Sequence, residues 1–106
     1  MAQLPQLTDS TLSHNARVAE LCFNRDDLRN ALTGTALVED LLATLEWCNT
    51  SPEVSVLIIT GAGKAFSRPT ALAVNLAQEL NITLACLDKD LGLILLCGRE
   101  RLVVNP

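Results

Sequence analysis

Hydrophobic residues recur along this chain with two different spacings, one typical of strands and one typical of helices. Residues 17–23 and 54–60 are short runs rich in apolar and β-branched side chains, and they predict strands. Between the two runs, leucines recur at helical spacing, at Leu37, Leu41, Leu42 and Leu45. This spacing gives a helix one buried stripe. Because such crossovers are right-handed, residues 17–60 are predicted to form a parallel βαβ unit.

The predicted helix has polar residues at both ends. Thr33 or Thr35 can cap its first turn with a hydroxyl group, and Asn-Thr-Ser-Pro at residues 49–52 stops it. Its polar side is expected to be solvated, including the acidic residues Glu39, Asp40 and Glu46.

A second helix is predicted after residue 68. Pro69 suits its first turn, because the N–H that proline lacks would be unpaired there. Leucines follow at four-residue spacing and are expected to cover the sheet, at Leu72, Leu76 and Leu80. Asn81 ends the helix.

The remaining segments complete a predicted α/β fold. Residues 82–87 and 93–97 are predicted strands on either side of a turn, and a short last segment follows Gly98. The aperiodic residues 1–15 are expected to be a loose arm. We therefore predict a small βαβ unit at 16–67 and an αββ tail at 68–106, packed together as one compact unit with a mixed sheet.

Composition limits the classes of function. With 106 residues, 49% of them hydrophobic, the chain can form one domain with an aliphatic core. A net charge of -4 with scattered lysines and arginines argues against nucleic-acid binding. No apolar run approaches the roughly 18 residues of a membrane helix, and the first ten residues lack signal-peptide features, so we expect a cytoplasmic protein with no membrane partner.

The cysteines and the single histidine do not indicate a metal site. The four cysteines show no C-x-x-C spacing, and His14 has no partner at ligand spacing. Three of the cysteines lie inside apolar runs and are expected to be buried, namely Cys22, Cys86 and Cys97.

Two motifs occupy the loops that follow the strands of the βαβ unit. Residues 23–33 are Phe-Asn-Arg-Asp-Asp-Leu-Arg-Asn-Ala-Leu-Thr, and residues 61–67 are Gly-Ala-Gly-Lys-Ala-Phe-Ser. Glycines just past a strand let the backbone turn toward a ligand, and ligands of α/β sheets bind at such strand ends. Together the motifs resemble the opening of the crotonase (enoyl-CoA hydratase/isomerase) superfamily over residues 16–67. The family usually continues Ala-Gly-Gly-Asp, whereas residues 68–71 are Arg-Pro-Thr-Ala.

This resemblance implies contacts with coenzyme A. The family's arginine and alanine that contact the coenzyme map to Arg29 and Ala31, and Ala65 lies near the pantetheine end. A full crotonase domain needs roughly 250 residues, so the resemblance implies a fragment. The alternative interpretation is that Arg29 is an ordinary solvated residue and that Gly61 and Gly63 form an ordinary turn.

Only some of the family's catalytic positions have a counterpart in this sequence. The first of the family's two backbone oxyanion donors maps to Arg68, but Pro69 has no N–H and holds Arg68 toward an extended backbone. The second donor and the acid/base carboxylates belong past Ser67, where the match ends. We therefore assign no catalytic residue and no resident cofactor, and expect at most weak acyl-CoA binding. Any activity would be of the enoyl-CoA hydratase/isomerase class of fatty-acid metabolism.

The tail resembles a different family. Residues 69–84 are similar to the closing segment of the formate dehydrogenase accessory sulfurtransferases, where a Thr-x-Leu-Ala-Val helix leads into a Leu-Thr-Leu strand, and Arg-Glu-Arg-Leu at 99–102 resembles that family's last turn. This resemblance implies a sulfur carrier for the molybdenum cofactor, which needs a nucleophilic cysteine. The family's C-x-x-C motif has no counterpart here, so Cys97 is the remaining candidate, with a buried strand residue as the alternative.

Three hypotheses follow for the whole chain. It is a crotonase-like fragment, a sulfurtransferase-like accessory protein, or a chimera, natural or engineered, that is joined at Ser67–Arg68 and folds without a ligand. Because both segments would lie outside their usual surroundings, apolar surface should stay exposed, and we expect self-association through it or through a strand edge.

Overall fold

The computed structural model describes residues 4–63, 71–88 and 92–98 of the protein. Its elements are β1 (Ser10–Asn15), β2 (Val18–Phe23), the 3-10 turn η1 (Asp26–Leu28), α1 (Leu37–Thr50), β3 (Val56–Gly61), α2 (Ala71–Glu79), β4 (Thr83–Asp88) and β5 (Gly92–Cys97). Both helices and four of the five strands coincide closely with predicted segments. The predicted α/β fold class is confirmed.

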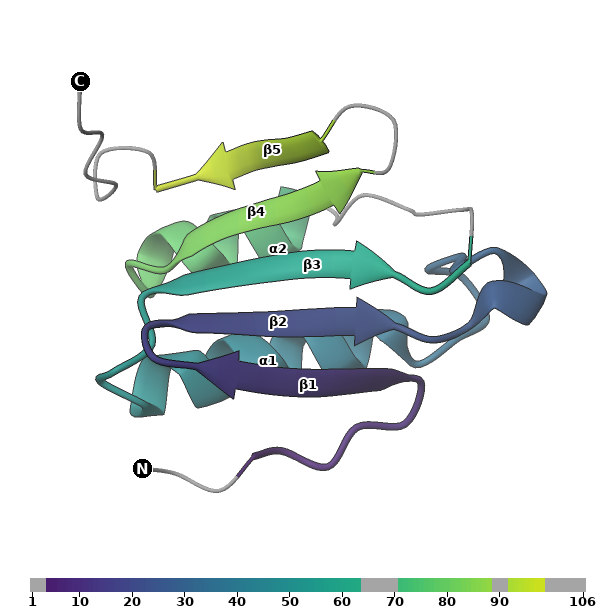
Figure 1. The fold of residues 1–106 in the computed structure, drawn as a ribbon, viewed down its shortest axis with the longest axis horizontal. Coiled ribbons are helices and arrows are strands. Elements are labelled where there is room, and N and C mark those ends of the chain that lie inside the picture. Colours follow the sequence, from purple (N-terminus) through teal and green to yellow (C-terminus); the bar gives the residue numbers. More distant parts are fainter. Residues whose placement is uncertain (1–3, 64–70, 89–91, 99–106) are drawn as a thin grey trace.

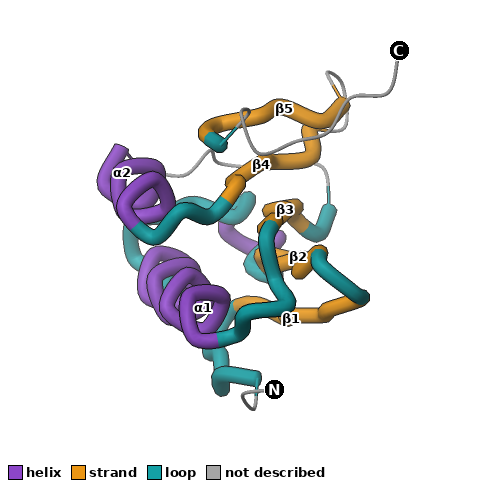
Figure 2. The backbone as a smooth tube through the Cα atoms, turned by 90° about the vertical axis from the view of Figure 1, so that its left-hand side faces the viewer, coloured by secondary structure: helices purple, strands orange, loops and turns teal. Residues whose placement is uncertain are grey.

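The five strands form one mixed sheet in which the order in space follows the order in sequence, β1-β2-β3-β4-β5. The three middle strands are parallel, whereas β1 and β5 pair antiparallel with their neighbours at the two edges. Parallel neighbours need crossover connections, and α1 and α2 supply them. Both helices lie on the same face of the sheet (Figure 1, Figure 2).

An aliphatic core lies between the sheet and the helices. Fully buried side chains on the helix-facing side of the strands include Leu21, Phe23, Leu57, Ile59 and Leu84. From α1, the predicted stripe residues Leu37, Leu41 and Leu45 are buried, while Leu42 lies half-buried at the margin of this stripe.

Helix α2 meets the sheet through alanines rather than through leucines. Ala73 and Ala77 are buried, whereas Leu76 and Leu80 are half-buried and pack against the core from its margin. The side chain of Leu72 lies outside the described part of the chain. Small residues let a helix lie close to a sheet, so the alanines form the closest contact, and the two described leucines that were expected to cover the sheet pack at the margin of the core.

Strand β1 corrects the expectation of a loose arm at residues 1–15. Ser10–Asn15 pairs antiparallel with β2, with Leu12 opposite Leu21 and His14 opposite Ala19. The connection between these strands is only two residues long, and Ala16 has a positive φ of 54° in it. Alanine rarely adopts this conformation, so the turn has no residue that would signal it in the sequence.

Asp40 is buried, which corrects the expectation that it lies at a solvated surface. Its exposed fraction is 4%, and its carboxylate accepts hydrogen bonds from Thr8 N (3.0 Å), Asp9 N (2.8 Å) and Ser10 Oγ (2.8 Å). These three donors satisfy the buried charge. Asp40 therefore fixes the segment that leads into β1 against helix α1.

A carboxylate from the segment before β1 accepts a hydrogen bond at the start of α1. Asp9 Oδ2 accepts a hydrogen bond from Ala36 N at 2.7 Å, and a negative charge is favourable at a helix N-terminus. The predicted cap residue Thr35 instead donates its hydroxyl to Ala31 O at 2.7 Å and lies 3.4 Å from Leu37 N. Thr33 is exposed and makes no capping hydrogen bond.

Candidate functional site

Two loops meet where the parallel strands β2 and β3 end. The first is the turn over residues 24–30 that contains η1, and the second is the segment 62–63 after β3 (Figure 1, right-hand side). Ala62 N donates to Phe23 O at 2.8 Å, which continues the strand pairing into the loops. This is the end of an α/β sheet at which ligands usually bind.

Asn30 joins the two loops. It is fully buried, its Oδ1 accepts from Arg25 N at 2.8 Å, and its Nδ2 donates to Ala62 O at 2.9 Å. Arg29 and Asn30 both have φ of 53°, in the left-handed region that asparagine tolerates better than most residues. Asn30 thereby positions the loop after β3 relative to the turn after β2.

Gly63 allows Asp26 to lie against the second loop. Gly63 has φ of 76°, and a Cβ atom at this position would collide with the Asp26 carboxylate. The backbone conformation therefore favours glycine, and any other residue would also displace the exposed carboxylate of Asp26.

Arg25 is held by two carboxylates in this cluster. Its guanidinium donates to both oxygens of Asp27, at 3.0 Å each, and to Asp9 Oδ2 at 3.2 Å. The hydrogen bond from Arg25 lowers the pKa of the Asp27 carboxyl group, and the hydrogen bond to Asp27 raises the pKa of Arg25. Arg25 therefore serves the structure of the turn and is not available to an incoming phosphate.

Arg29 is the arginine of this turn that is available for a ligand. It is exposed, and its side chain makes no hydrogen bond or ion pair with any residue that the structure describes. Ala31 follows one residue beyond Asn30, is half-buried, and donates its N–H to Leu28 O at 3.1 Å. The predicted Ala65 and Arg68 lie outside the described residues, so the structure brings Arg29 and Ala31 alone to this site.

The described residues of the cluster have a charge balance that is unfavourable for polyphosphates. Among them, three carboxylates, those of Asp9, Asp26 and Asp27, outnumber the two guanidinium groups of Arg25 and Arg29. Because coenzyme A carries several negative charges, repulsion by the free Asp26 offsets part of the attraction to Arg29.

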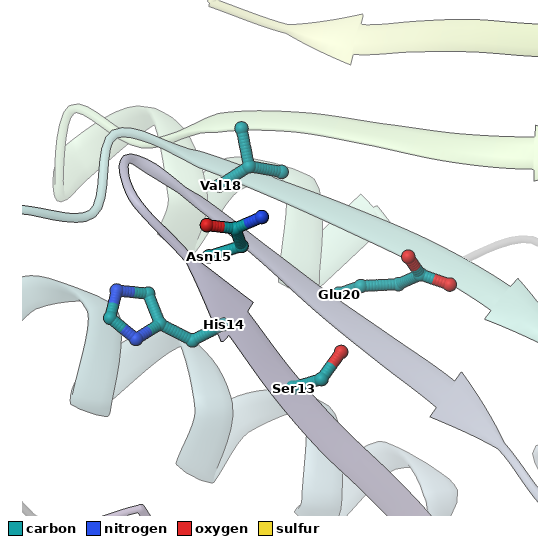
Figure 3. A pocket seen from close by; sticks show the side chains of 5 residues that line it. All are labelled: Ser13, His14, Asn15, Val18 and Glu20. Carbon is teal, nitrogen blue, oxygen red and sulfur yellow. The ribbon is translucent and has the colours of Figure 1, made fainter.

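A shallow depression of about 310 Å³ lies at the opposite end of the strands, near the β1–β2 turn (Figure 3). It is lined by Ser13, His14, Asn15, Val18 and Glu20. The described residues of this lining include a carboxylate and no arginine or lysine, which does not favour a phosphate. His14 instead takes part in packing, because its ring meets that of Trp47 edge-on at 5.7 Å.

The cysteines give no support to sulfur transfer. Cys97 is buried, and its thiol contacts Ile82 O at 3.6 Å, which fits the interpretation of a strand residue. Burial raises the pKa of Cys48 to about 12, which suppresses its thiolate form. Cys86 is also buried as expected, whereas Cys22 is half-buried on the other face of the sheet.

The described residues contain no group of potential metal ligands, and none of their helices is long and apolar enough to cross a bilayer.

The chain is similar to several solved structures, although no protein-family model and no curated protein matches it. An enoyl-CoA hydratase from Mycobacterium avium subsp. paratuberculosis K-10 is 25% identical, with a TM-score of 0.62 over 79% of this chain and 37% of that one. A probable enoyl-CoA hydratase/isomerase from Mycobacterium abscessus is 33% identical, with a TM-score of 0.52 over 61% of this chain and 26% of that one. A methylmalonyl-CoA decarboxylase in complex with 2-nitronate-propionyl-CoA is 17% identical, with a TM-score of 0.65 over 79% and 40%.

These similarities extend into the tail. A match over 79% of 106 residues covers about 84 residues, which is more than the 67 that precede the predicted junction. Part of the segment after residue 67 therefore occupies positions of the same fold, and the comparisons give no support to a sulfurtransferase-like tail. The chain spans 37% to 40% of the length of the solved structures that it matches over 79% of its own length. The described part of the protein therefore has a crotonase-like α/β fold.

Proposed function

We propose that the loops after β2 and β3 form part of a coenzyme A contact surface, in which Arg29 is the residue that attracts the ligand's phosphates. The observation that carries this proposal is the exposed Arg29, whose side chain has no partner among the described residues, on a turn that Asn30 fixes to the loop after β3. The names of similar structures support it, since one is an enoyl-CoA hydratase and another is a probable enoyl-CoA hydratase/isomerase. The ligand class is an acyl-CoA thioester.

The affinity is expected to be weak. Binding a long, flexible ligand costs conformational and translational freedom, and one arginine with a few backbone contacts offsets little of this cost. The free carboxylate of Asp26 beside Gly63 lowers the affinity further.

Titration calorimetry with coenzyme A tests this site. We expect a dissociation constant of about 1 mM, weakened about tenfold or more in Arg29→Ala. Arg17→Ala is the matched control, because Arg17 is an exposed arginine that binds Ser55 Oγ near the β1–β2 turn, away from these loops. Asp26→Asn should move the affinity in the opposite direction, because it removes a repelling charge from the same turn. Micromolar binding that Arg29→Ala leaves unchanged would contradict the proposal.

We further propose that the chain by itself does not turn over enoyl-CoA substrates. The resemblance assigns the second oxyanion donor and the acid/base carboxylates to positions past Ser67, where the sequence no longer matches. Loss of one oxyanion donor typically costs about 10²- to 10³-fold in rate, and the carboxylates are needed in addition.

The corresponding assay follows the loss of the conjugated enoyl thioester of crotonyl-CoA. The expected rate equals that of buffer alone. A rate above buffer that is lost in Gly63→Ala would show that the loop after β3 supports catalysis, and the proposal of inactivity would then have to be abandoned.

A further inference from the structure

The two edges of the sheet differ in chemistry. Edge strand β1, Ser-Thr-Leu-Ser-His-Asn, has one aliphatic residue, whereas edge strand β5, Gly-Leu-Ile-Leu-Leu-Cys, has no charged residue and no proline. Natural sheets usually protect an edge strand with charges, proline or irregular pairing. In β5 the register shift falls at Leu96, so residues 92–95 keep a regular register. Within the described residues, β5 pairs only with β4.

The apolar edge continues into an apolar face of the sheet. Leu57 and Ile59 face the helices and pair with Leu84 and Cys86, so alternation points Leu87 to the opposite face. Leu93, which pairs with Leu87, lies on that opposite face as well. Leu87 is 42% exposed and Leu93 is 60% exposed. Since α1 and α2 both lie on the other side (Figure 2), no described helix covers these leucines.

We propose that strand β5 pairs antiparallel with β5 of a second copy of this chain about a two-fold axis, which continues the sheet across the dimer. The strand is self-complementary, because every cross-strand pair within residues 92–95 brings together leucine, isoleucine or glycine and opposes no charges. In the register that places Leu93 opposite Leu93 of the second copy, Gly92 pairs with Ile94, and the two exposed Leu93 side chains meet at the axis on one face of the sheet.

The size of this contact sets its strength. Four regular residues extend over only about 13 Å of strand, so the interface is far smaller than the standard size of roughly 1,600 Å². The dimer therefore dissociates reversibly, with a dissociation constant in the micromolar range or weaker.

Sedimentation velocity over a dilution series of the full chain tests the proposal. The mass is expected to fall from 22.8 kDa, which is twice the chain mass of 11.4 kDa, to 11.4 kDa on dilution. Leu93→Lys should raise the dissociation constant at least about tenfold, because it places two like charges across the axis. Leu4→Lys is the matched control, because Leu4 is 45% exposed and belongs to the segment that leads to β1, and it should dimerise like the unchanged chain.

A third variant separates edge pairing from stacking of the two open faces. Val18 is 38% exposed and lies at the start of β2, away from β5, where it faces away from the helices because its neighbour Ala19 is buried. Edge pairing predicts that Val18→Lys dimerises normally. The proposal is overturned if the unchanged chain stays at 11.4 kDa at every concentration, if Val18→Lys is the variant that dissociates, or if Leu4→Lys weakens the dimer as much as Leu93→Lys.

Hydrogen exchange provides a readout that needs no substitution. Amide protection of residues 92–95 should increase with protein concentration, while that of α1 and β3 stays constant. The same measurement shows whether Leu93→Lys keeps its fold. Protection of β5 that does not depend on concentration would also overturn the proposal.

Discussion

Replacement of Asn30 by alanine is expected to lower the free energy of unfolding by about 2–4 kcal/mol. Asn30 is fully buried, and its side chain satisfies Arg25 N and Ala62 O at 2.8 and 2.9 Å. Alanine leaves both backbone groups without this partner, and it tolerates the positive φ of 53° less well than asparagine does. Urea unfolding, with the slope compared between variants, measures the effect.

Asn81→Ala is the matched control for this prediction. Asn81 also has a positive φ, 58°, but it is exposed after the end of α2. Its replacement by alanine changes the backbone preference without removing buried hydrogen bonds. The loss in free energy of unfolding should therefore be smaller than for Asn30→Ala by at least about 1 kcal/mol. Equal losses of stability in Asn30→Ala and Asn81→Ala would show that the hydrogen bonds between the two loops contribute little.

The parts of the fold that the sequence predicted are those with a strong local pattern. The aliphatic run that forms β3 and the leucine spacing of α1 are each sufficient to identify an element. Asn81, which ends α2 in the left-handed region, is a further local signal of this kind. The helical crossover between them then predicts that β2 and β3 are parallel, whereas the parallel placement of β4 beside β3 was not predicted.

The parts that the sequence did not predict depend on contacts between distant residues. Strand β1 has one aliphatic side chain in six and pairs through its backbone, which leaves little pattern to detect. The helical pattern alone places Asp40 at a solvated surface. In the structure, residues about thirty positions away donate three hydrogen bonds to it. Likewise, the alanines of α2 become its buried residues only because the helix lies close to the sheet.

At the candidate site, the residue types were predictable but their arrangement was not. The resemblance to crotonases pointed to Arg29 and Ala31, and the structure places both on the turn beside the loop after β3. Asn30 lies between them and was not singled out, although an asparagine in a short turn is a known signal for a left-handed residue. The contact of Asp26 with Gly63 joins two segments far apart in sequence, so no local pattern could have indicated it.

The polypeptide of residues 1–67 alone is expected to show no cooperative unfolding transition. The core cluster is shared across the predicted junction, because Ala73, Ala77 and Leu84 belong to the same cluster as Leu57. Without β4, strand β3 becomes an unprotected aliphatic edge, and a unit of this size buries too little apolar surface to be stable. Thermal melts followed by circular dichroism of the short and full-length chains measure the difference.

A chain that ends at residue 98 is the control, because it is also shortened but keeps α2, β4 and β5. It retains every residue of the core cluster that lies in the described part of the chain, the last of which is Cys97, and it keeps Gly98, whose carbonyl accepts a hydrogen bond from Thr83 Oγ1 at 3.0 Å. We therefore expect this chain to unfold cooperatively near the temperature of the full-length protein. If residues 1–67 instead melt cooperatively at that same temperature, α2, β4 and β5 contribute nothing to the stability of the first unit, and the protein does not unfold as a single cooperative unit.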